Sequence, residues 1–264
     1  MAYSFSRDRV QYPLTSRIGV VHEVEHLAGI YRVHIDLPEE TTIKALGPTD
    51  HLKIFVADDP SRRIELPQPH AGQRPQLSPG VVSRDVTIRE VNGSRLIFDV
   101  VNHRSGPLIE WVRNVRPGMS ATTAGPRGSL LAPAAPRLFM CVDASALPAA
   151  ARWLECTSAE KITLVTRTSG IDIAQYLGSA LAKQNVTWYS YDDQAPARHI
   201  IDRLAGYNFA EHYVWCAGEA QWLIPIRRWL RTCPQLSHEN ISVEGYWKLG
   251  VSGHDHHAQL DPEE

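Results

Sequence analysis

The hydrophobic pattern of this chain changes at Leu131–Pro136, a segment of small residues and two prolines. Before it, stretches such as Arg17–Val24 and Ile30–Leu37 alternate apolar and polar residues, which is typical of antiparallel strands with one exposed face. After it, continuous apolar runs alternate with helical stretches, as in a parallel sheet that is covered on both faces. The sequence therefore predicts two domains, residues 1–132 and 133–264: an antiparallel β-barrel followed by an α/β domain.

Five or six short strands with turn signals between them predict a small closed barrel in the first domain. The proline-rich segment Pro67–Pro79 predicts an exposed loop between two of these strands. In the second domain, strands are expected at the apolar runs Arg137–Val142, Lys161–Thr166, Val186–Ser190 and Tyr213–Ala217. Helices are expected at Leu147–Leu154, Ile171–Ala182, Ala197–Leu204 and Gln221–Arg231.

Composition excludes several classes of function. The 27 Lys and Arg against 29 Asp and Glu give a net charge of -2 without a long basic run, so nucleic acid is not an expected partner. No apolar run approaches the ~18 residues of a membrane helix and the first residues lack the apolar core of a signal peptide, so we expect no membrane insertion and a cytoplasmic location. The 4 cysteines contain no C-x-x-C pair, which argues against a disulfide framework and an iron–sulfur cluster.

The stretch Val81–Glu90 places an arginine on the apolar face of a predicted strand. Val82, Arg84, Val86 and Ile88 alternate there with polar residues. A buried guanidinium is unfavourable unless it is paired, so Arg84 is expected to meet an anion. The residues alone leave open whether that anion is a carboxylate of the protein or a ligand.

Two turn motifs follow this strand. The segment Asn102–Trp111 contains Gly106-Pro107, which predicts a turn into a short helix, and Ala124–Ser129 is a glycine-flanked loop. Free N–H groups and the positive end of the helix dipole converge at a helix start. Together with Arg84 they could hold the pyrophosphate of a flavin nucleotide.

The three motifs in this order resemble those of siderophore-interacting proteins, which are ferric-siderophore reductases of the ferredoxin–NADP reductase superfamily. That family has Arg-x-Tyr-Thr on the flavin strand, then His-Gly-x-x-Gly-Pro-Ala-x-x-Trp, then Gly-Pro-Arg-Gly-Ser. The similar segments here are Arg84–Thr87, His103–Trp111 and Gly125–Ser129, and the similarity runs from about Arg17 to Gly250. Each motif is weakly specific by itself, whereas their order and spacing together are strongly specific.

The resemblance implies that FAD binds to the barrel. The residues it assigns to the cofactor are Arg84, Val86, Thr87, His103, Gly106, Pro107, Leu108, Ile109, Trp111, Gly125, Arg127, Gly128 and Ser129. Val86 replaces the family's tyrosine, which borders the isoalloxazine ring, and so loses stacking worth on the order of 1 kcal/mol. Ile109 stands where many relatives have a small or hydroxylated residue. We still expect FAD to bind, because neither change removes the backbone donors to phosphate.

The first strand-to-helix turn of the second domain, Val142–Pro148, lies where open parallel sheets bind their ligands. Asp143 or Ser145 can cap the helix, and from the residues alone a capped helix without a ligand explains the turn as well. The family has Gly-Asp-x-Thr-Ala-Leu-Pro here, so the resemblance implies NADPH or NADH contacts at Asp143, Ser145, Ala146, Gly218 and Glu219. Val142 in place of the glycine leaves open how closely a phosphate can approach.

The segment Val243–Gly250 resembles the family's Gly-Tyr-Trp-Arg/Lys sequence, and Trp247 is expected either in the core or near the flavin ring. Basic residues at family positions imply a pocket for an anionic, catecholate-type ferric siderophore. The candidates are Lys53, Arg127 and Lys248, each of which could equally be a solvated surface charge. The histidines of the tail Gly253–His257 are not assigned to a metal.

The function that the resemblance implies is FAD-dependent reduction of ferric siderophores. NADPH, NADH or a reduced ferredoxin would supply the electrons, and Fe(II) would be released. No catalytic residue is assigned, because the cofactor carries the chemistry. The alternatives are a general NAD(P)H:flavin or quinone reductase and a non-catalytic siderophore- or flavin-binding protein. The sequence identifies neither the siderophore, nor the donor, nor the oligomeric state.

Overall fold

The computed structural model describes residues 3–65, 77–183, 185–254, 258–261 and 263, and the chain divides into two compact units. One unit is Arg9–Leu131, and the other is Ala132–Glu264 together with Met1–Asp8. Residues 67–76 of the predicted proline-rich loop lie outside the described residues. No helix in the described part of the chain combines the length and hydrophobicity that crossing a membrane requires.

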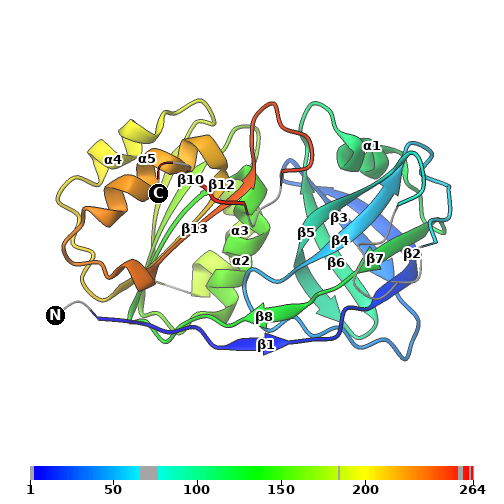
Figure 1. Cartoon of the computed structure of the whole chain (residues 1–264), viewed down its shortest axis with the longest axis horizontal. Coiled ribbons are helices and arrows are strands. Elements are labelled where there is room, and N and C mark those ends of the chain that lie inside the picture. The colour runs from blue at the N-terminus through cyan, green and yellow to red at the C-terminus, as the bar shows by residue number, and fades with distance from the viewer. Residues whose placement is uncertain (1–2, 66–76, 184, 255–257, 262, 264) are drawn as a thin grey trace. The chain divides into compact units, whose positions relative to one another are not determined.

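The first unit is a closed antiparallel barrel, as the alternating pattern predicts (Figure 1). Its strands follow one another in the order β2-β3-β6-β5-β4-β7. They are β2 (Ser16–Leu27), β3 (Ile30–Asp36), β4 (His51–Ala57), β5 (Val81–Asn92), β6 (Arg95–Val101) and β7 (Ser120–Ala124). The helix α1 (Pro107–Asn114) lies between β6 and β7 in the chain and contributes Ile109, Trp111 and Val112 to the barrel core.

A short two-stranded sheet accompanies the barrel, formed by β1 (Arg9–Gln11) and β8 (Gly128–Leu130). The prediction of a loop over the whole of Ala124–Ser129 is therefore wrong at its end, where β8 begins. Gly128 allows this pairing, because a Cβ there would lie only 2.5 Å from the carbonyl oxygen of Val10. A three-residue strand is too short to show an alternating pattern in the sequence.

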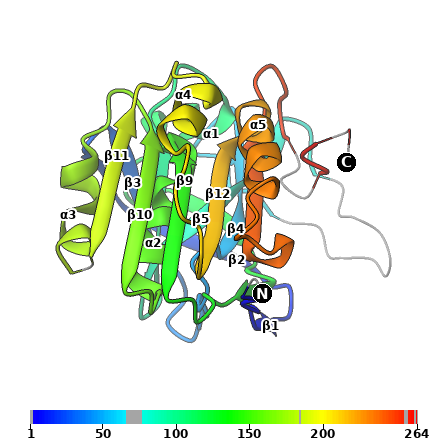
Figure 2. The same ribbon diagram turned by 90° about the vertical axis from the view of Figure 1, so that its left-hand side faces the viewer.

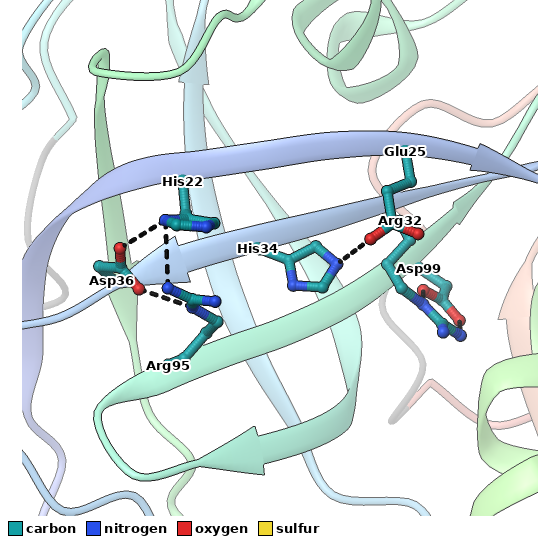
Figure 3. A network of polar contacts seen from close by, with 7 residues as sticks. All are labelled: His22, Glu25, Arg32, His34, Asp36, Arg95 and Asp99. Atoms are coloured by element: carbon teal, nitrogen blue, oxygen red, sulfur yellow. Dashed lines mark hydrogen bonds and ion pairs between the residues drawn. The ribbon is translucent and has the colours of Figure 1, made fainter.

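Ion pairs connect side chains of the neighbouring strands β2, β3 and β6 (Figure 3). Arg32 makes a bidentate contact with the fully buried carboxylate of Asp99, at 2.8 and 2.9 Å. Asp36 accepts a hydrogen bond from Nε of Arg95 and contacts His22, and the Arg95 guanidinium holds the pKa of Asp36 below its usual value. These pairs fix the register of the strands on a face that carries no motif residue.

The second unit is a five-stranded parallel sheet with strand order β11-β10-β9-β12-β13. The strands are β9 (Arg137–Asp143), β10 (Lys161–Arg167), β11 (Val186–Tyr191), β12 (His212–Glu219) and β13 (Ile241–Trp247). The helical segments are η1 (Ala144–Ala146), α2 (Leu147–Cys156), α3 (Ile173–Lys183), α4 (Ala197–Arg203), α5 (Ala220–Arg231) and η2 (His238–Asn240). The four predicted strands and four predicted helices are confirmed, whereas β13 was not predicted.

Helices pack on both faces of this sheet, which explains why its central strands are apolar throughout. The helices α4 and α5 cover the face that carries Phe139, Cys141 and Val165, and Figure 2 shows both in front of the sheet. On the other face, Trp153 of α2 packs against Tyr213 and Trp215 of β12. The strand order reverses between β9 and β12, and ligands of open α/β sheets bind beyond the carboxyl ends of the strands at such a point.

Candidate functional site

The strand β5 positions the first motif of the barrel. Arg84 lies opposite Ile54 of β4, is half-buried, and donates from Nη1 to the carbonyl oxygen of Ser83 at 2.8 Å. Val86, on the same face, is 6% exposed and belongs to the barrel core. Thr87 is buried on the alternate face, opposite His51. Of the predicted FAD contacts on β5, Arg84 is therefore the half-buried charged residue, while Val86 is an apolar core residue.

The start of α1 is shaped by a glycine. Gly106 has φ 141° and ψ 155°, a conformation open essentially only to glycine, and Pro107 occupies the first helical turn. Gly106 has no side chain to cap the helix, and among the described residues no side-chain acceptor is found for the N–H groups of Leu108 and Ile109. The exposed Glu110 accepts a long hydrogen bond of 3.3 Å from the N–H of Gly106. This helix start therefore suits a phosphate oxygen.

The loop before α1 is held by an arginine of the helix itself. Arg113 donates to the side-chain oxygen of Asn102 and to the carbonyl oxygen of His103, each at 2.7 Å. Partial burial lowers the pKa of His103, and the Arg113 charge acts in the same direction. His103 lies beside the helix start, whereas Trp111 is buried in the core.

The third motif combines a buried Gly-Pro turn with a buried hydroxyl. Gly125 has φ 106°, and its carbonyl oxygen accepts a 2.7 Å hydrogen bond from Nη1 of Arg17. The hydroxyl of Ser129 is 2% exposed; it contacts the carboxylate of Asp50 and the hydroxyl of Tyr12, and accepts from the N–H of Leu46. Ser129 therefore connects three segments of the barrel unit.

Basic side chains of the barrel differ in their pairing. Nζ of Lys53, on β4, contacts both carboxylate oxygens of Asp85, on β5, at 2.8 and 2.9 Å. Arg127 is exposed, and its carbonyl oxygen accepts from the N–H of Tyr12. The third predicted substrate residue, Lys248, belongs to the other unit and follows β13. The charge of Lys53 is thus offset by Asp85, a pairing that the sequence did not indicate.

In the second unit, the carboxylate of Asp143 joins three strand ends. One oxygen accepts from the N–H and the hydroxyl of Ser145, at 2.8 and 2.6 Å. The other accepts from the N–H of Glu219 at 2.8 Å and from Nε1 of Trp247 at 2.9 Å. Burial raises the pKa of Asp143 above its usual value, although all four hydrogen bonds act in the opposite direction.

Glu219 and Gly218 complete the carboxyl edge of the sheet. Glu219 caps α5 by accepting from the N–H of Trp222, and its other oxygen accepts from the N–H of Leu249. Gly218 has φ 149°, and a Cβ there would lie 2.5 Å from Cγ of Asp143. Ala146 and Val142 are fully buried, so the side chain of Val142 packs in the core. The structure thus brings Asp143, Ser145, Glu219 and Trp247 together, with Trp247 40% exposed.

A metal site has no support in the part of the chain that the structure describes, where no group of three or more His, Cys, Asp or Glu side chains is arranged to hold an ion. Asp255, His256 and His257 of the tail lie outside the described residues. Cys141 and Cys216 face each other on β9 and β12 and are buried, and burial raises the pKa of the Cys141 thiol.

Two family models match the chain in tandem. Residues 20–130 match the siderophore-interacting FAD-binding domain, and residues 135–250 match the siderophore-interacting protein model. The first match lies within the barrel unit and the second within the sheet unit. Together they cover the three barrel motifs and the carboxyl edge of the sheet.

Individual proteins are similar over nearly the whole chain. The NADPH-dependent ferric-chelate reductase of Escherichia coli (strain K12) is 27% identical over 250 residues, covering 90% of this chain and 95% of that protein. The ferric acinetobactin reductase of Acinetobacter baumannii is 24% identical over 236 residues, covering 83% of this chain and 78% of that protein. Among solved structures, a siderophore utilization protein from T. fusca matches with a TM-score of 0.78 at 29% identity, covering 96% of this chain and 100% of that one.

Proposed function

Because the chain belongs to the siderophore-interacting protein family, we propose that it is an FAD-dependent reductase of ferric siderophores that takes its electrons from NADPH. The main support for this proposal is the match of residues 20–130 to the FAD-binding domain of the family. These residues form the barrel, and Gly106 at the start of its helix α1 has no side chain to cap the helix. Two similar proteins, from Escherichia coli (strain K12) and Acinetobacter baumannii, are named as ferric-chelate and ferric acinetobactin reductases.

FAD, when bound, supplies electron transfer between a nicotinamide and ferric iron. The residues of the chain have to hold it. Arg84 and the free N–H groups at the start of α1 offer positive charge and donors to the pyrophosphate. Gly106 keeps the backbone accessible there because it has no side chain. Asp143 holds the carboxyl edge of the sheet in one arrangement, where the nicotinamide nucleotide would bind.

The siderophore itself would be recognised by charge. Ferric catecholates are anionic, and the exposed Arg127 is the basic candidate of the barrel for which no acidic partner is found among the described residues. Lys53 shares its charge with Asp85. We therefore propose that the barrel unit attracts an anionic ferric catecholate mainly through Arg127, with a smaller contribution from Lys53.

One observation favours a second function. A general NAD(P)H:flavin or quinone reductase needs no basic residues around its pocket, and the Lys53–Asp85 pair removes one of three predicted positive charges. The two functions differ in substrate. An anaerobic assay with FAD-loaded protein, NADPH and a ferrous-iron indicator distinguishes them. The proposed function requires faster turnover with a ferric siderophore than with a quinone or free flavin, and the opposite order contradicts it.

Replacing Asp85 with asparagine is expected to improve the use of anionic chelates. The change removes the carboxylate that offsets Lys53, and unit charges a few ångströms apart in water interact by about 1 kcal/mol, so KM for a ferric catecholate should fall roughly two- to fivefold. The effect should disappear at high salt, since the Debye length is only about 3 Å at 1 M. KM for a neutral ferric hydroxamate should not change.

The exposed Asp58, at the end of β4, offers a matched control for this charge change. Asp58→Asn alters the net charge equally without touching Lys53. If both variants change KM for the catecholate to the same degree, the effect is one of overall charge and Lys53 does not contact the chelate.

A further inference from the structure

The strand β10 ends on an arginine at the carboxyl edge of the parallel sheet. Arg167 pairs in register with Asp143 of β9 on one side and with Tyr191 of β11 on the other. It is followed by Thr168, Ser169 and Gly170, and the positive φ of 71° at Gly170 turns the chain away from the sheet. Arg167 therefore stands one strand away from the point where the strand order reverses.

Two buried N–H donors at this edge lack a hydrogen-bond acceptor. The guanidinium of Arg167 lies over the indole ring of Trp222 in α5, with 4.9 Å from Cζ to the ring centroid. In the part of the chain that the structure describes, neither Nε of Arg167 nor Nε1 of Trp222 has a partner. Buried donors are nearly always satisfied by protein, water or a ligand. The N–H groups of Arg167 and Trp222 therefore indicate that an acceptor binds here.

The carboxylates near this edge are already engaged with other donors. Asp143 accepts four hydrogen bonds, none of them from Arg167, and Glu219 caps α5. Asp192, just after β11, accepts from the N–H of Gln194 and the hydroxyl of Ser169; these bonds, and more weakly the charge of Arg167, lower its pKa. Arg167 therefore forms no ion pair with any of these carboxylates.

We propose that Arg167 binds the 2′-phosphate of the adenosine ribose of NADPH and makes the chain select NADPH over NADH. The inference rests on the proposed function and deepens it. Sheets of this class recognise the ribose with an acidic residue when they bind NAD and with an arginine when they bind NADP. Arg167–Gly170 contains a guanidinium and two hydroxyl groups but no carboxylate. A planar guanidinium held over the ring of Trp222 can present its donors to a phosphate in a defined orientation.

The test measures equilibrium binding rather than turnover. FAD-loaded full-length protein is titrated calorimetrically with 2′,5′-ADP and with 5′-AMP, which differ only in the 2′-phosphate. The wild type should bind 2′,5′-ADP tighter by roughly 10- to 100-fold, as expected for charge-assisted hydrogen bonds. Arg167→Ala should bring the two affinities to within a few fold of each other, and Arg167→Lys should retain part of the difference.

Control variants separate a local from a general effect. Lys161 is an exposed cation at the opposite end of the same strand, so Lys161→Ala should leave the ratio of the two affinities unchanged. Asp192→Asn removes a carboxylate just after β11 and should increase the preference for 2′,5′-ADP. Because Trp222 lies under Arg167, 2′,5′-ADP should also change the tryptophan fluorescence of the wild type more than 5′-AMP does.

Equal affinities of the wild type for 2′,5′-ADP and 5′-AMP would overturn the inference, as would an undiminished preference in Arg167→Ala. Inorganic phosphate that binds at Arg167 without any preference between the two nucleotides would also overturn it, since the site would then hold an adventitious ion only. The proposed function is tested by a separate measurement. If chemically reduced FAD-loaded protein still reduces a ferric siderophore, that function stands whatever the nucleotides do.

Discussion

Replacing Arg84 with alanine is expected to weaken FAD binding by roughly 10- to 100-fold, because hydrogen bonds from a charged donor to phosphate contribute about 1.5–3 kcal/mol. Arg84 is half-buried on β5, so part of the desolvation free energy of its guanidinium is already spent when the barrel folds, before the cofactor binds. Arg84→Lys should recover part of the affinity, since a lysine supplies the charge without the planar pair of donors. Quenching of FAD fluorescence on titration with apoprotein measures both affinities.

A matched control for this change is Arg63→Ala. Arg63 is an arginine of the same unit whose side chain is 67% exposed and pairs loosely with Glu65, so its loss should leave the FAD affinity unchanged. Thermal unfolding of each apoprotein checks that both variants are folded. An Arg84→Ala protein that is as stable as the wild type and binds FAD equally well would show that Arg84 does not contact the pyrophosphate.

Replacing Asp143 with alanine is expected to lower the free energy of unfolding by about 3 kcal/mol, because one buried and two partly buried N–H groups from three segments lose their acceptor. The donors left behind are the N–H of Ser145, the N–H of Glu219 and the indole N–H of Trp247. For a unit of this size the melting temperature should fall by roughly 5–10 °C. Differential scanning calorimetry with the FAD-loaded protein measures the change.

Asp172→Ala provides the comparison. Asp172 is exposed before α3, and its carboxylate accepts a hydrogen bond from the N–H of Gln175, so loss of this side chain should cost only about 1 kcal/mol. Equal effects of the two substitutions would mean that the four hydrogen bonds of Asp143 contribute no more than one cap. The indole fluorescence of Trp247 should also change in Asp143→Ala alone, since that ring loses its hydrogen-bond acceptor.

The architecture could be predicted because each part of the chain repeats one hydrophobic period. Alternation before Leu131 and continuous apolar runs after Ala135 correspond to a barrel with an outer polar face and to a sheet covered by helices. The missed elements lack such a period. β1 and β8 have three residues each. β13 is an edge strand with mixed burial, and its sequence shows neither strict alternation nor a continuous apolar run.

Motif residues could be located in the sequence, but their partners could not. Lys53 and Asp85 meet because β4 and β5 pair in one register, and a one-residue shift would send their side chains to opposite faces. The stacking of Arg167 on Trp222 likewise depends on which face of the sheet α5 covers. Chain topology brings such residues together, and no local pattern in the sequence records it. Val86 was expected to border the flavin, and whether it does remains a prediction.

The central claim is that the chain passes electrons from bound FAD to siderophore-bound Fe(III). The most direct measurement loads the purified protein with FAD, reduces it anaerobically, and mixes it with a ferric siderophore while the visible flavin absorbance is followed. A ferric-siderophore reductase should regain its oxidised-flavin band as ferrous iron is captured by an indicator. A band that stays bleached with the siderophore but returns on addition of a quinone would contradict the account and favour a general reductase. A protein that takes up no FAD would contradict it as well and favour a non-catalytic binding protein.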